Sequence, residues 1–343
     1  MGRRRSLACA FAIASLAVAC GGAQSPDPAS GEDDVSSRCS PTSKRKSELE
    51  LSVWPDAGEA VIVDPLQAAT KSIRLMVYML GQDGVFKALV DRHEAGVDVR
   101  VILDGGAQRH FNQPAFDALG KAGVKVEWSD PKFSYMHAKS IVIDDELAIV
   151  STGNFPKGLI LDERNYVVAD RDPDDVKSLA SVFDADFTHT DPSLTCTRLL
   201  VSPVNSKPRV LQVLDAAKKS LLVETLELAD ADILQAIIDK KKAGLDVRVV
   251  IADPSWSKTN NNAATAKTLA AAGVPVRWIP KSRFLVHVKN IQSDGKLAYM
   301  GSENLTTTSL TKNREIGVEV TDGAALATMA ATFEADYASA NAF

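Results

Sequence analysis

Residue types that bind transition metals are scarce in this sequence, which has 4 cysteines and 5 histidines among 343 residues. No two cysteines form a CxxC pair, and no Cys/His spacing is typical of a structural zinc site. We therefore expect neither a structural metal nor any other cofactor.

Positive charge is also in short supply, because 39 lysines and arginines face 44 aspartates and glutamates, for a net charge of -5. Without the three arginines at residues 3–5 the net charge is -8. A chain of this charge does not attract nucleic acid or anionic lipid by its overall field. No basic stripe interleaved with aromatic residues is present either, so we expect no dedicated nucleic-acid surface. An anionic substrate must then be bound by a local cluster of cations.

The apolar run near the N-terminus, Leu7–Ala19, is too short to cross a bilayer as a helix. It follows three arginines and ends in small residues, which is the pattern of a secretory signal peptide over residues 1–19. The ending Ala17–Cys20 resembles a bacterial lipobox, in which Cys20 becomes the lipid-carrying first residue. We expect an exported lipoprotein anchored in a bacterial envelope, with the outer membrane or periplasmic face favoured. A plain cleaved signal and a secreted protein are the alternative.

Residues 20–48 are dense in Gly, Ser, Pro and charge, and we expect a flexible tether there. The folded part then begins at residue 49, with 45% hydrophobic and 24% charged residues in the chain as a whole, both globular values. Cys39 and Cys196 flank the first part of this region and either form a disulfide or remain free thiols.

The chain contains an internal duplication. "AGVDVRVILD" recurs as "AGLDVRVVIAD" 148 residues later, and "KAGVKVEW" recurs as "AAGVPVRW" 150 residues later. Two copies of so long a unit are a duplicated domain rather than a solenoid. We expect a first domain over residues 49–193 and a second over residues 194–343.

Within each copy, apolar runs of strand length alternate with segments of helical periodicity. "SIRLMVYML" and "SLLVETLEL" are each followed by a helical pattern and then by a second strand, which ends at Asp104 or at Asp253. This alternation predicts an α/β fold in which helices flank a mostly parallel or mixed sheet. In such sheets functional groups gather where strands end, so the loops after Asp104 and Asp253 are candidate site loops.

One pattern of reactive residues occurs in both copies. "HAKSIVIDDELAIVSTGN" spans 137–154, and "HVKNIQSDGKLAYMGSEN" spans 287–304, again 150 residues apart. Both read H-x-K-x4-D, followed after six residues by a small-residue segment that ends in asparagine. Two such motifs in register within a repeat are far rarer than one, so the pattern is strong evidence for a reactive centre.

This pair of motifs resembles the phospholipase D superfamily, whose mark is two HKD motifs, each followed by a G-S-x-N element. The resemblance covers nearly the whole folded part, and implies two tandem α/β domains related by a pseudo-two-fold axis, with a mixed sheet flanked by helices in each. Gly301, Ser302 and Asn304 match the G-S-x-N element, whereas its counterpart in the first copy is Ser151, Thr152 and Asn154.

The spacing of the motif has a physical reason of its own. Residues two apart on a strand point to the same face, so His137 lies beside Lys139 and His287 beside Lys289. Two such strands brought together by the symmetry of the duplication form a cationic cage for one phosphate. We expect the two lysines to hold the phosphate oxygens without a metal. The side-chain amides of Asn154 and Asn304, in the elements that follow the motifs, are expected to help them.

A phosphodiester requires a nucleophile at phosphorus and a proton for the leaving alcohol, and two histidines supply both through a phosphohistidine. The family resemblance implies that Glu315 supports His287, the histidine of its own half, while the equivalent position after His137 is Asn165. A carboxylate favours the protonated imidazole. We therefore predict that His137 is the nucleophile and His287 the general acid.

The remaining residues of the two motifs are expected to support the site. Asp144 and Asp294 lie seven residues after their histidines, on the other face of an ideal strand, and we expect them to orient the site rather than act as acids. Ser302 and Thr152 are candidate donors, either directly to the phosphate or to groups behind it.

The expected activity is a metal-independent phosphodiesterase of phospholipase D type that acts on phospholipid at a membrane surface, where the lipid anchor holds it. Phosphatidyl transfer, as in cardiolipin synthases, follows from the same intermediate and is one alternative; an exported nuclease and an unproductive phosphate-binding module are others. The candidate site loops contain His110, Trp256 and Lys258. Each of these side chains either contacts the substrate or is simply exposed at the surface. A monomer is sufficient to complete the site, because both motifs are on one chain.

Overall fold

The computed structural model describes residues 44–343 except residues 82, 156–161 and 195–196. The expected signal peptide, Cys20, Cys39, Cys196 and the tether up to residue 43 lie outside the described residues. In the part of the chain that is described, no helix combines the length and the apolar character needed to cross a membrane.

The first half of the folded chain alternates strands and helices as the sequence predicts. The predicted strand "SIRLMVYML" forms β2 and the helical pattern after it forms α3. In chain order, the elements are β1 (Glu50–Trp54), α2 (Ala60–Ala68), β2 (Ser72–Val77), α3 (Gly84–Glu94), β3 (Asp98–Leu103), α4 (Arg109–Lys121), β4 (Lys125–Trp128), β5 (Lys139–Ile143), β6 (Leu147–Ser151), β7 (Glu163–Asp170) and α6 (Pro173–Phe187).

The second half repeats this order of elements. Its predicted strand "SLLVETLEL" forms β9, and the helical pattern after it forms α8. In chain order, the elements are β8 (Leu199–Ser202), α7 (Ser206–Ala216), β9 (Ser220–Thr225), α8 (Ala231–Lys242), β10 (Asp246–Ala252), the short 3₁₀ turn η1 (Pro254–Trp256), α9 (Asn262–Ala271), β11 (Val276–Ile279), β12 (Leu285–Val286), β13 (Lys289–Ser293), β14 (Leu297–Gly301), α10 (Thr307–Thr311), β15 (Glu315–Val320), α11 (Gly323–Ser339) and β16 (Asn341–Ala342).

The two sheets have the same strand order. The first runs β4-β3-β2-β5-β6-β7-β1, and the second runs β11-β10-β9-β13-β14-β15-β8, with β16 added beyond β11. In each, the strands joined through helices are parallel, and the strands that carry the HKD motif are antiparallel to their neighbours. The expected mixed α/β sheet in each of two homologous halves is thereby confirmed.

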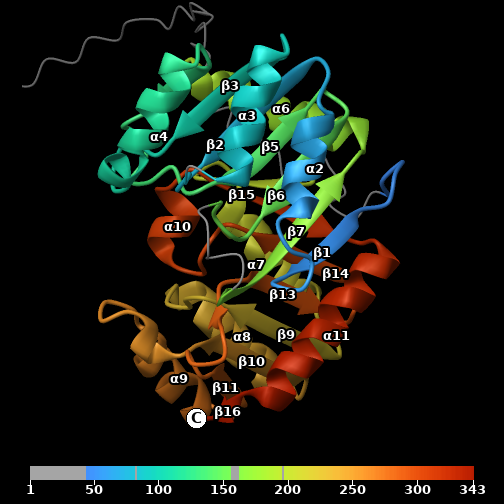
Figure 1. Ribbon diagram of the computed structural model, residues 1–343. Coiled ribbons are helices and arrows are strands. Elements are labelled where there is room, and N and C mark those ends of the chain that lie inside the picture. Colours follow the sequence, from blue (N-terminus) through green and yellow to red (C-terminus); the bar gives the residue numbers. More distant parts are fainter. Residues whose placement is uncertain (1–43, 82, 156–161, 195–196) are drawn as a thin grey trace, which may run out of the picture. The chain divides into compact units, whose positions relative to one another are not determined.

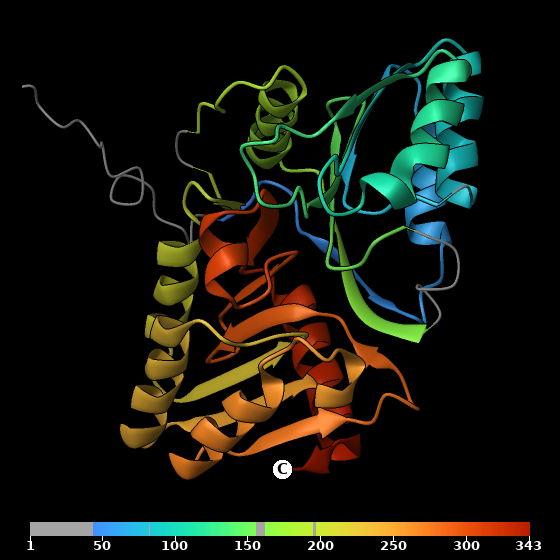
Figure 2. The same cartoon turned by 90° about the vertical axis from the view of Figure 1, so that its left-hand side faces the viewer.

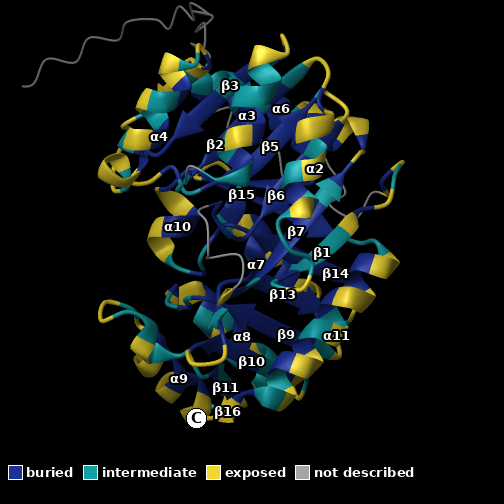
Figure 3. Ribbon diagram, viewed as in Figure 1, coloured by how far each residue is buried: buried dark blue, intermediate teal, exposed yellow. Residues whose placement is uncertain are grey.

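Each sheet buries both of its faces. One face of the first sheet packs under α2, α3 and α4, and one face of the second packs under α7, α8 and α9 (Figure 1). Each sheet forms a separate apolar core with its three helices. The opposite faces contribute to a central core shared by both halves, to which α6 and α11 add Phe183 and Phe333. Figure 3 shows the consequence: the central strands of each sheet are buried, whereas the outer faces of the helices are exposed.

The halves also exchange polar contacts across this central region. Strand β12 of the second half pairs with β7 of the first, as Figure 2 allows the reader to follow. Arg164, in β7, forms an ion pair of 2.8 Å with Asp336 of α11, and Arg314, just before β15, forms one of 2.8 Å with Asp186 of α6. The two arginines therefore make the same crossed contact in opposite directions, as pseudo-two-fold symmetry requires.

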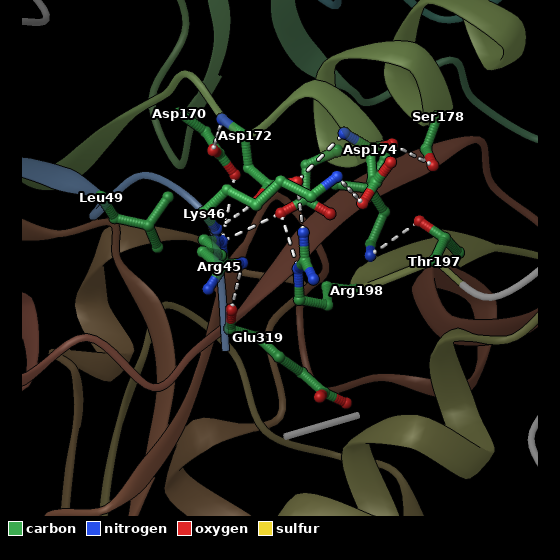
Figure 4. A network of polar contacts seen from close by, with 12 residues as sticks. Arg45, Lys46, Leu49, Asp170, Asp172, Asp174, Ser178, Thr197, Arg198 and Glu319 are labelled. Carbon is green, nitrogen blue, oxygen red and sulfur yellow. Dashed lines mark hydrogen bonds and ion pairs between the residues drawn. The ribbon is translucent and has the colours of Figure 1, made fainter. Parts of the chain in front are cut away.

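A buried network of charges joins the halves around Arg45, a residue of the segment before β1 (Figure 4). The Arg45 guanidinium, 1% exposed, lies 2.9 Å from Asp175, 3.2 Å from Asp170 and 3.0 Å from Asp322, and donates to the carbonyl of Glu319. We call these five residues the Arg45 network. Two of its carboxylates belong to the first half, and Asp322 and Glu319 belong to the second.

The Arg45 network changes the expected extent of the tether. The sequence places residues 20–48 in a flexible tether, but Arg45 is buried, and the backbone N–H of Lys46 donates to Asp172 at 2.7 Å. The composition of this segment is that of a linker; what orders its last residues is a set of carboxylates that lie more than 120 residues away along the chain. The folded part accordingly includes residues 45–48.

One carboxyl of the Arg45 network should make stability depend on pH. Burial and the neighbouring carboxylate of Asp175 raise the pKa of Asp170 from 3.8 to about 7. Because the folded-state pKa is the higher one, this group contributes stability below pH 4 that is lost as the pH rises through 7. We expect the free energy of unfolding to fall between pH 5 and pH 8, by on the order of 2 kcal/mol from this group.

Urea unfolding of the wild-type chain and of Asp170→Asn at pH 5, 6, 7 and 8 measures this contribution. The amide cannot ionise, so the variant should show a flatter pH dependence than the wild type. Asp174→Asn, which removes an exposed carboxylate close by, is the control and should leave the dependence unchanged. Equal slopes in the wild type and in Asp170→Asn would contradict the expectation.

Candidate active site

Both motif histidines are held at the boundary between the halves. His137 lies two residues before β5, and its backbone N–H donates to the carbonyl of Arg314 at 2.8 Å. His287 lies two residues before β13, and its N–H donates to the carbonyl of Arg164 at 3.0 Å. Asp104, at the end of β3, adds a second anchor by accepting the N–H of Met136 at 2.8 Å. Each histidine is thus positioned by the backbone of the other half.

The side chain of His137 pairs with a carboxylate of the second half. Its Nδ1 lies 2.8 Å from Oε2 of Glu315, and the Glu315 side chain is fully buried. The family resemblance implied that Glu315 supports His287, in its own half, and that expectation is wrong. The physical reason is the crossed backbone contact: because Arg314 binds the backbone of His137, the next residue presents its side chain to the same histidine.

The side chain of His287 pairs with an amide of the first half. Its Nδ1 lies 2.9 Å from Oδ1 of Asn165 and 3.2 Å from Oε2 of Glu163. The NH₂ group of Asn165 donates to Glu163 at 3.0 Å, which leaves the amide oxygen to accept the Nδ1–H of His287. The expected place of Asn165, beside His137, is therefore also wrong, for the same reason.

Two residues of this arrangement were missed from the sequence. Glu163 precedes Asn165 by two residues, and Asn313 precedes Glu315 by two and donates to it at 2.9 Å. The first half reads "ERN" where the second reads "NRE", so glutamate and asparagine have exchanged places between the copies. Comparison of the two copies at an offset of 150 residues would have revealed the exchange.

The buried surroundings lower the proton affinity of both imidazoles. Burial lowers the pKa of His137 from 6.5 to about 4, although the charge of Glu315 acts in the opposite direction. Burial, followed by the charges of Lys289 and Lys139, lowers the pKa of His287 well below 6.5. Burial raises the pKa of Glu315, but the charge and hydrogen bond of His137 outweigh it and hold that pKa below the ordinary value. These shifts favour the neutral form of both histidines, and neither Nε2 has a hydrogen-bond partner within the described part of the chain.

The two motif lysines lie beside the histidines, as the strand spacing predicts. Lys139 and Lys289 are fully buried, and each donates from Nζ to the backbone carbonyl of the histidine two residues before it, Lys289 at 2.7 Å. Burial lowers the pKa of Lys289 to about 7 and that of Lys139 well below 10.5. A bound phosphate anion would offset this burial, so the lysines favour an anionic ligand.

Tyr78, which follows β2, closes one side of His137. The two rings meet edge to face with centroids 4.5 Å apart, and Nζ of Lys139 lies 5.1 Å from the centre of the tyrosine ring. Aromatic contacts of this kind fix the orientation of an imidazole. The apolar pattern of β2 did not distinguish this tyrosine as a site residue.

The two asparagines of the G-S-x-N elements remain candidates for binding the phosphate. The amide oxygens of Asn154 and Asn304 have no hydrogen-bond partner within the described part of the chain. An amide in that condition can turn and present its NH₂ group to a phosphate oxygen. Asn304 also lines the same cavity as His137.

The hydroxyl groups of the same elements contact the residues that pair with the two histidines. Ser302 donates to Oε2 of Glu315 at 2.7 Å, and Thr152 donates to Oδ1 of Asn165 at 2.8 Å. Both side chains are fully buried. They orient the partners of the two histidines, so the direct phosphate contact considered for them from the sequence is not what the structure shows.

The glycine of the second element is required by a close approach. A Cβ on Gly301 would lie 2.4 Å from Oε2 of Glu303 and 2.4 Å from Cα of Gly317. In the first half Gly153 stands where Glu303 stands in the second, so no carboxyl fills that space. Ser151 is accommodated there, and its hydroxyl bonds to the backbone of Gly153 at 3.0 Å.

The aspartates of the two HKD motifs are remote from the chemistry. Asp144 accepts the backbone N–H groups of Thr70, Lys71 and Ser72, and Asp294 accepts those of residues 218–220. Both lie beyond the far ends of β5 and β13, about 17 Å along an extended chain from the lysines. We expected these two aspartates to orient the site, but their side chains bind the starts of neighbouring strands, at the ends of β5 and β13 that lie away from the histidines.

A cavity of about 620 Å³ opens on His137. Its walls come from both halves, and the loop after β10, a predicted site loop, supplies Trp256. His110 and Lys258 are exposed and are not among the described lining residues. The full lining is Tyr78, Tyr135, His137, Glu227, Ala229, Trp256, Thr259, Asn261, Asn304, Thr306, Thr307, Thr308, Ser309 and Asn313.

The described side chains form no group of three or more metal-ligating residues. The charged side chains next to the two histidines are those of Lys139, Lys289, Glu315 and Glu163. The arrangement can place a phosphate between two imidazoles, with a cation beside each.

Comparison with known proteins places the chain in a family. The family described as "Cardiolipin synthase, PLD-like domain" matches residues 62–187 and 210–337, once in each half. The chain therefore belongs to the phospholipase D-like family, and the resemblance drawn from the paired HKD motifs is confirmed.

Individual relatives agree with this membership. "Minor cardiolipin synthase ClsB" of Bacillus subtilis (strain 168) is 25% identical over 335 residues, covering 86% of this chain and 82% of the relative. "Mitochondrial cardiolipin hydrolase" of Chlamydomonas reinhardtii is 27% identical over 122 residues, covering 36% of this chain and 54% of the relative. The solved phosphatidylserine synthase of Haemophilus influenzae Rd KW20 shares the fold with a TM-score of 0.68, at 12% identity, over 86% of this chain and 87% of that one.

Proposed function

We propose that the chain transfers a phosphatidyl group from one phospholipid to an alcohol, through a phosphohistidine on His137 and without a metal ion. The observation that carries this proposal is the unequal pairing of the two histidines, one with a carboxylate and one with an amide. The match to a protein named as a cardiolipin synthase, over 86% of this chain, favours transfer over the hydrolysis expected first from the sequence.

In the first step, Nε2 of His137 attacks phosphorus and the bond from phosphorus to the head-group oxygen breaks. A phosphorylated imidazole carries positive charge, and the buried carboxylate of Glu315 at Nδ1 stabilises that charge. A carboxylate therefore suits the nucleophile. The assignment of His137 as nucleophile is the one expected from the sequence, but the reason is the reverse of the expected one.

The leaving oxygen takes its proton from Nε2 of His287. The anionic phosphate, bound between the rings, favours the protonated form of this imidazole when the substrate enters. Asn165 accepts from Nδ1 without adding a full charge, so it stabilises the imidazolium less than a carboxylate does and leaves it the stronger acid. Glu163, whose pKa burial raises, lies slightly further from Nδ1.

In the second step, His287 is neutral and accepts the proton of an acceptor alcohol. The alcohol oxygen attacks phosphorus and the bond from phosphorus to His137 breaks, which leaves His137 neutral and His287 protonated, as they were with substrate bound; His287 releases this proton when the product leaves. Water in place of the alcohol gives phosphatidic acid, which is the hydrolytic alternative. The partial match to a protein named as a cardiolipin hydrolase supports keeping that alternative.

The test uses the chain from residue 44 onward with phosphatidylglycerol vesicles, with and without added ethanol, in EDTA. We expect cardiolipin without ethanol and phosphatidylethanol with it, both detected by mass spectrometry. Phosphatidic acid alone under both conditions would establish hydrolysis instead of transfer. Absence of every lipid product, from protein shown to be folded, would contradict both, and cleavage of DNA under the same conditions would favour the nuclease reading.

Export and lipid attachment at Cys20 are part of the same proposal. They rest on the sequence of residues 1–20 alone, which lie outside the described part of the structure. An anchor of this kind would hold the cavity close to its phospholipid substrate and would not require an assembly of more than one chain.

A further inference from the structure

One acidic side chain stands in the wall of the cavity that opens on His137. Apart from the histidine, the described lining residues are aromatic, hydroxyl-bearing, amide or alanine side chains, and Glu227 is the only carboxylate among them. No lysine or arginine belongs to this described lining. The cavity is therefore polar, with a single negative charge at one position.

Glu227 lies two residues after the end of β9, and its backbone is held firmly. The carbonyl of Glu227 accepts the N–H of Leu305 at 3.0 Å and the hydroxyl of Thr225 at 3.3 Å. The carboxylate, in contrast, is bonded within the described part of the chain only to Asn261, through the backbone N–H at 3.4 Å and the side-chain amide, and it forms no ion pair there. Its oxygens are thus available to a ligand in the cavity.

This position carries an electrostatic cost. A carboxylate near a site that binds an anionic phosphodiester repels this substrate. Burial raises the pKa of Glu227, because water solvates the carboxylate only partly. Nothing in the fold requires the charge, since the corresponding residue of the first half is Met79, 148 positions earlier. A substrate group that donates hydrogen bonds to the carboxylate would offset the cost.

We propose that Glu227 is a specificity-determining residue that accepts hydrogen bonds from a donor group on the phospholipid head group, either a hydroxyl or an ammonium. This inference rests on the proposed function, because it assigns the cavity to the head group attached to the phosphate. The same cavity is lined by Thr306, Thr307 and Thr308 at the start of α10, and the Thr307 hydroxyl donates to Asp230 at 2.7 Å. Such a site selects head groups with donors over head groups without them.

The test is a competition within one vesicle population that contains equal amounts of phosphatidylglycerol, phosphatidylethanolamine and phosphatidylmethanol. The wild-type chain should consume the first two in preference to phosphatidylmethanol, which has no donor on its head group. In Glu227→Gln that preference should fall about tenfold, the effect of losing a charge-assisted hydrogen bond. The ratio is internal to each reaction, so a change in total activity does not alter it.

Asp232→Asn is the matched control, because it removes an exposed carboxylate of the same half outside the cavity, and it should leave both ratios unchanged. A fall for phosphatidylethanolamine alone assigns the contact to an ammonium, and a fall for phosphatidylglycerol assigns it to hydroxyls. Unchanged ratios in Glu227→Gln overturn the inference.

Failure of the proposed function gives a different result. If the wild-type chain consumes none of the three lipids, calorimetry with soluble glycerophosphoethanolamine and glycerophosphoglycerol on the folded chain measures the same contact without turnover. Weaker binding by about tenfold in Glu227→Gln than in Asp232→Asn supports the role of Glu227, and equal binding overturns it.

Discussion

Replacement of His137 by alanine is expected to abolish turnover, with a loss of about 10⁴-fold or more, because the proposed covalent intermediate forms on its Nε2. Replacement of His287 by alanine should act differently. With phospholipid, whose leaving alcohol needs a proton, the expected loss is about 10² to 10⁴-fold.

An aryl phosphodiester separates the two roles. Its leaving group needs no proton, so His287→Ala should still release about one equivalent of phenol per chain and then stop, because the second step has lost its base. Phosphate label carried by the aryl ester should then remain on His137, where peptide mapping at neutral to alkaline pH can locate it. His137→Ala should give neither the burst nor the label.

The opposite pattern would reverse the assignment. Label on His287 in a His137→Ala chain, with a burst of phenol, would mean that the amide-paired histidine is the nucleophile and that the pairing with Glu315 serves the general acid. Thermal unfolding of both variants should be compared with that of the wild type, so that a loss of folding is not taken for a loss of chemistry.

Replacement of Arg45 by alanine is expected to lower the free energy of unfolding by about 3–5 kcal/mol, the usual effect of removing one partner from a buried ion pair. The carboxylates of Asp170, Asp175 and Asp322 would lose the guanidinium that lies among them. For a folded part of this size, that change corresponds to a fall in Tm of roughly 5–15 °C, measurable by calorimetry.

The neighbouring residue provides the control. The Lys46 side chain is 66% exposed and pairs only with the exposed Asp174, so Lys46→Ala should change the free energy of unfolding by less than about 0.5 kcal/mol. Similar small effects of Arg45→Ala and Lys46→Ala would show that the Arg45 network does not stabilise the fold.

The sequence predicted the architecture well because the relevant signals are local or repeated. Alternating apolar strands and helical patterns, present twice at a nearly constant offset, are enough to predict two mixed α/β sheets. The order of the strands and the place of Arg45 could not be predicted in this way. Arg45 stands in a segment with the composition of a linker, and only the folded chain brings its partners in residues 170–175 and 319–322 together.

For the site, the sequence predicted that each motif lysine lies beside its histidine, because strand periodicity alone puts the two side by side. It failed where partners come from the other half. Glu315 and Asn165 were identified as supporting residues but were assigned to the wrong histidines, since position along one copy says nothing about which copy faces it across the central core. Asp144 and Asp294 share a motif with the reacting groups, yet they bind backbone at the opposite ends of the strands.

The exchange of "ERN" for "NRE" shows that fusing the two halves in one chain allows their histidines to have different partners. A symmetric dimer of the first half alone would present the same amide and the same glutamate to both of its histidines, and a dimer of the second half would repeat its own pair twice. Neither dimer could assign different tasks to its two imidazoles before substrate arrives. On a single chain each copy mutates independently, so a substitution of one residue in each half gives the two histidines permanently different partners.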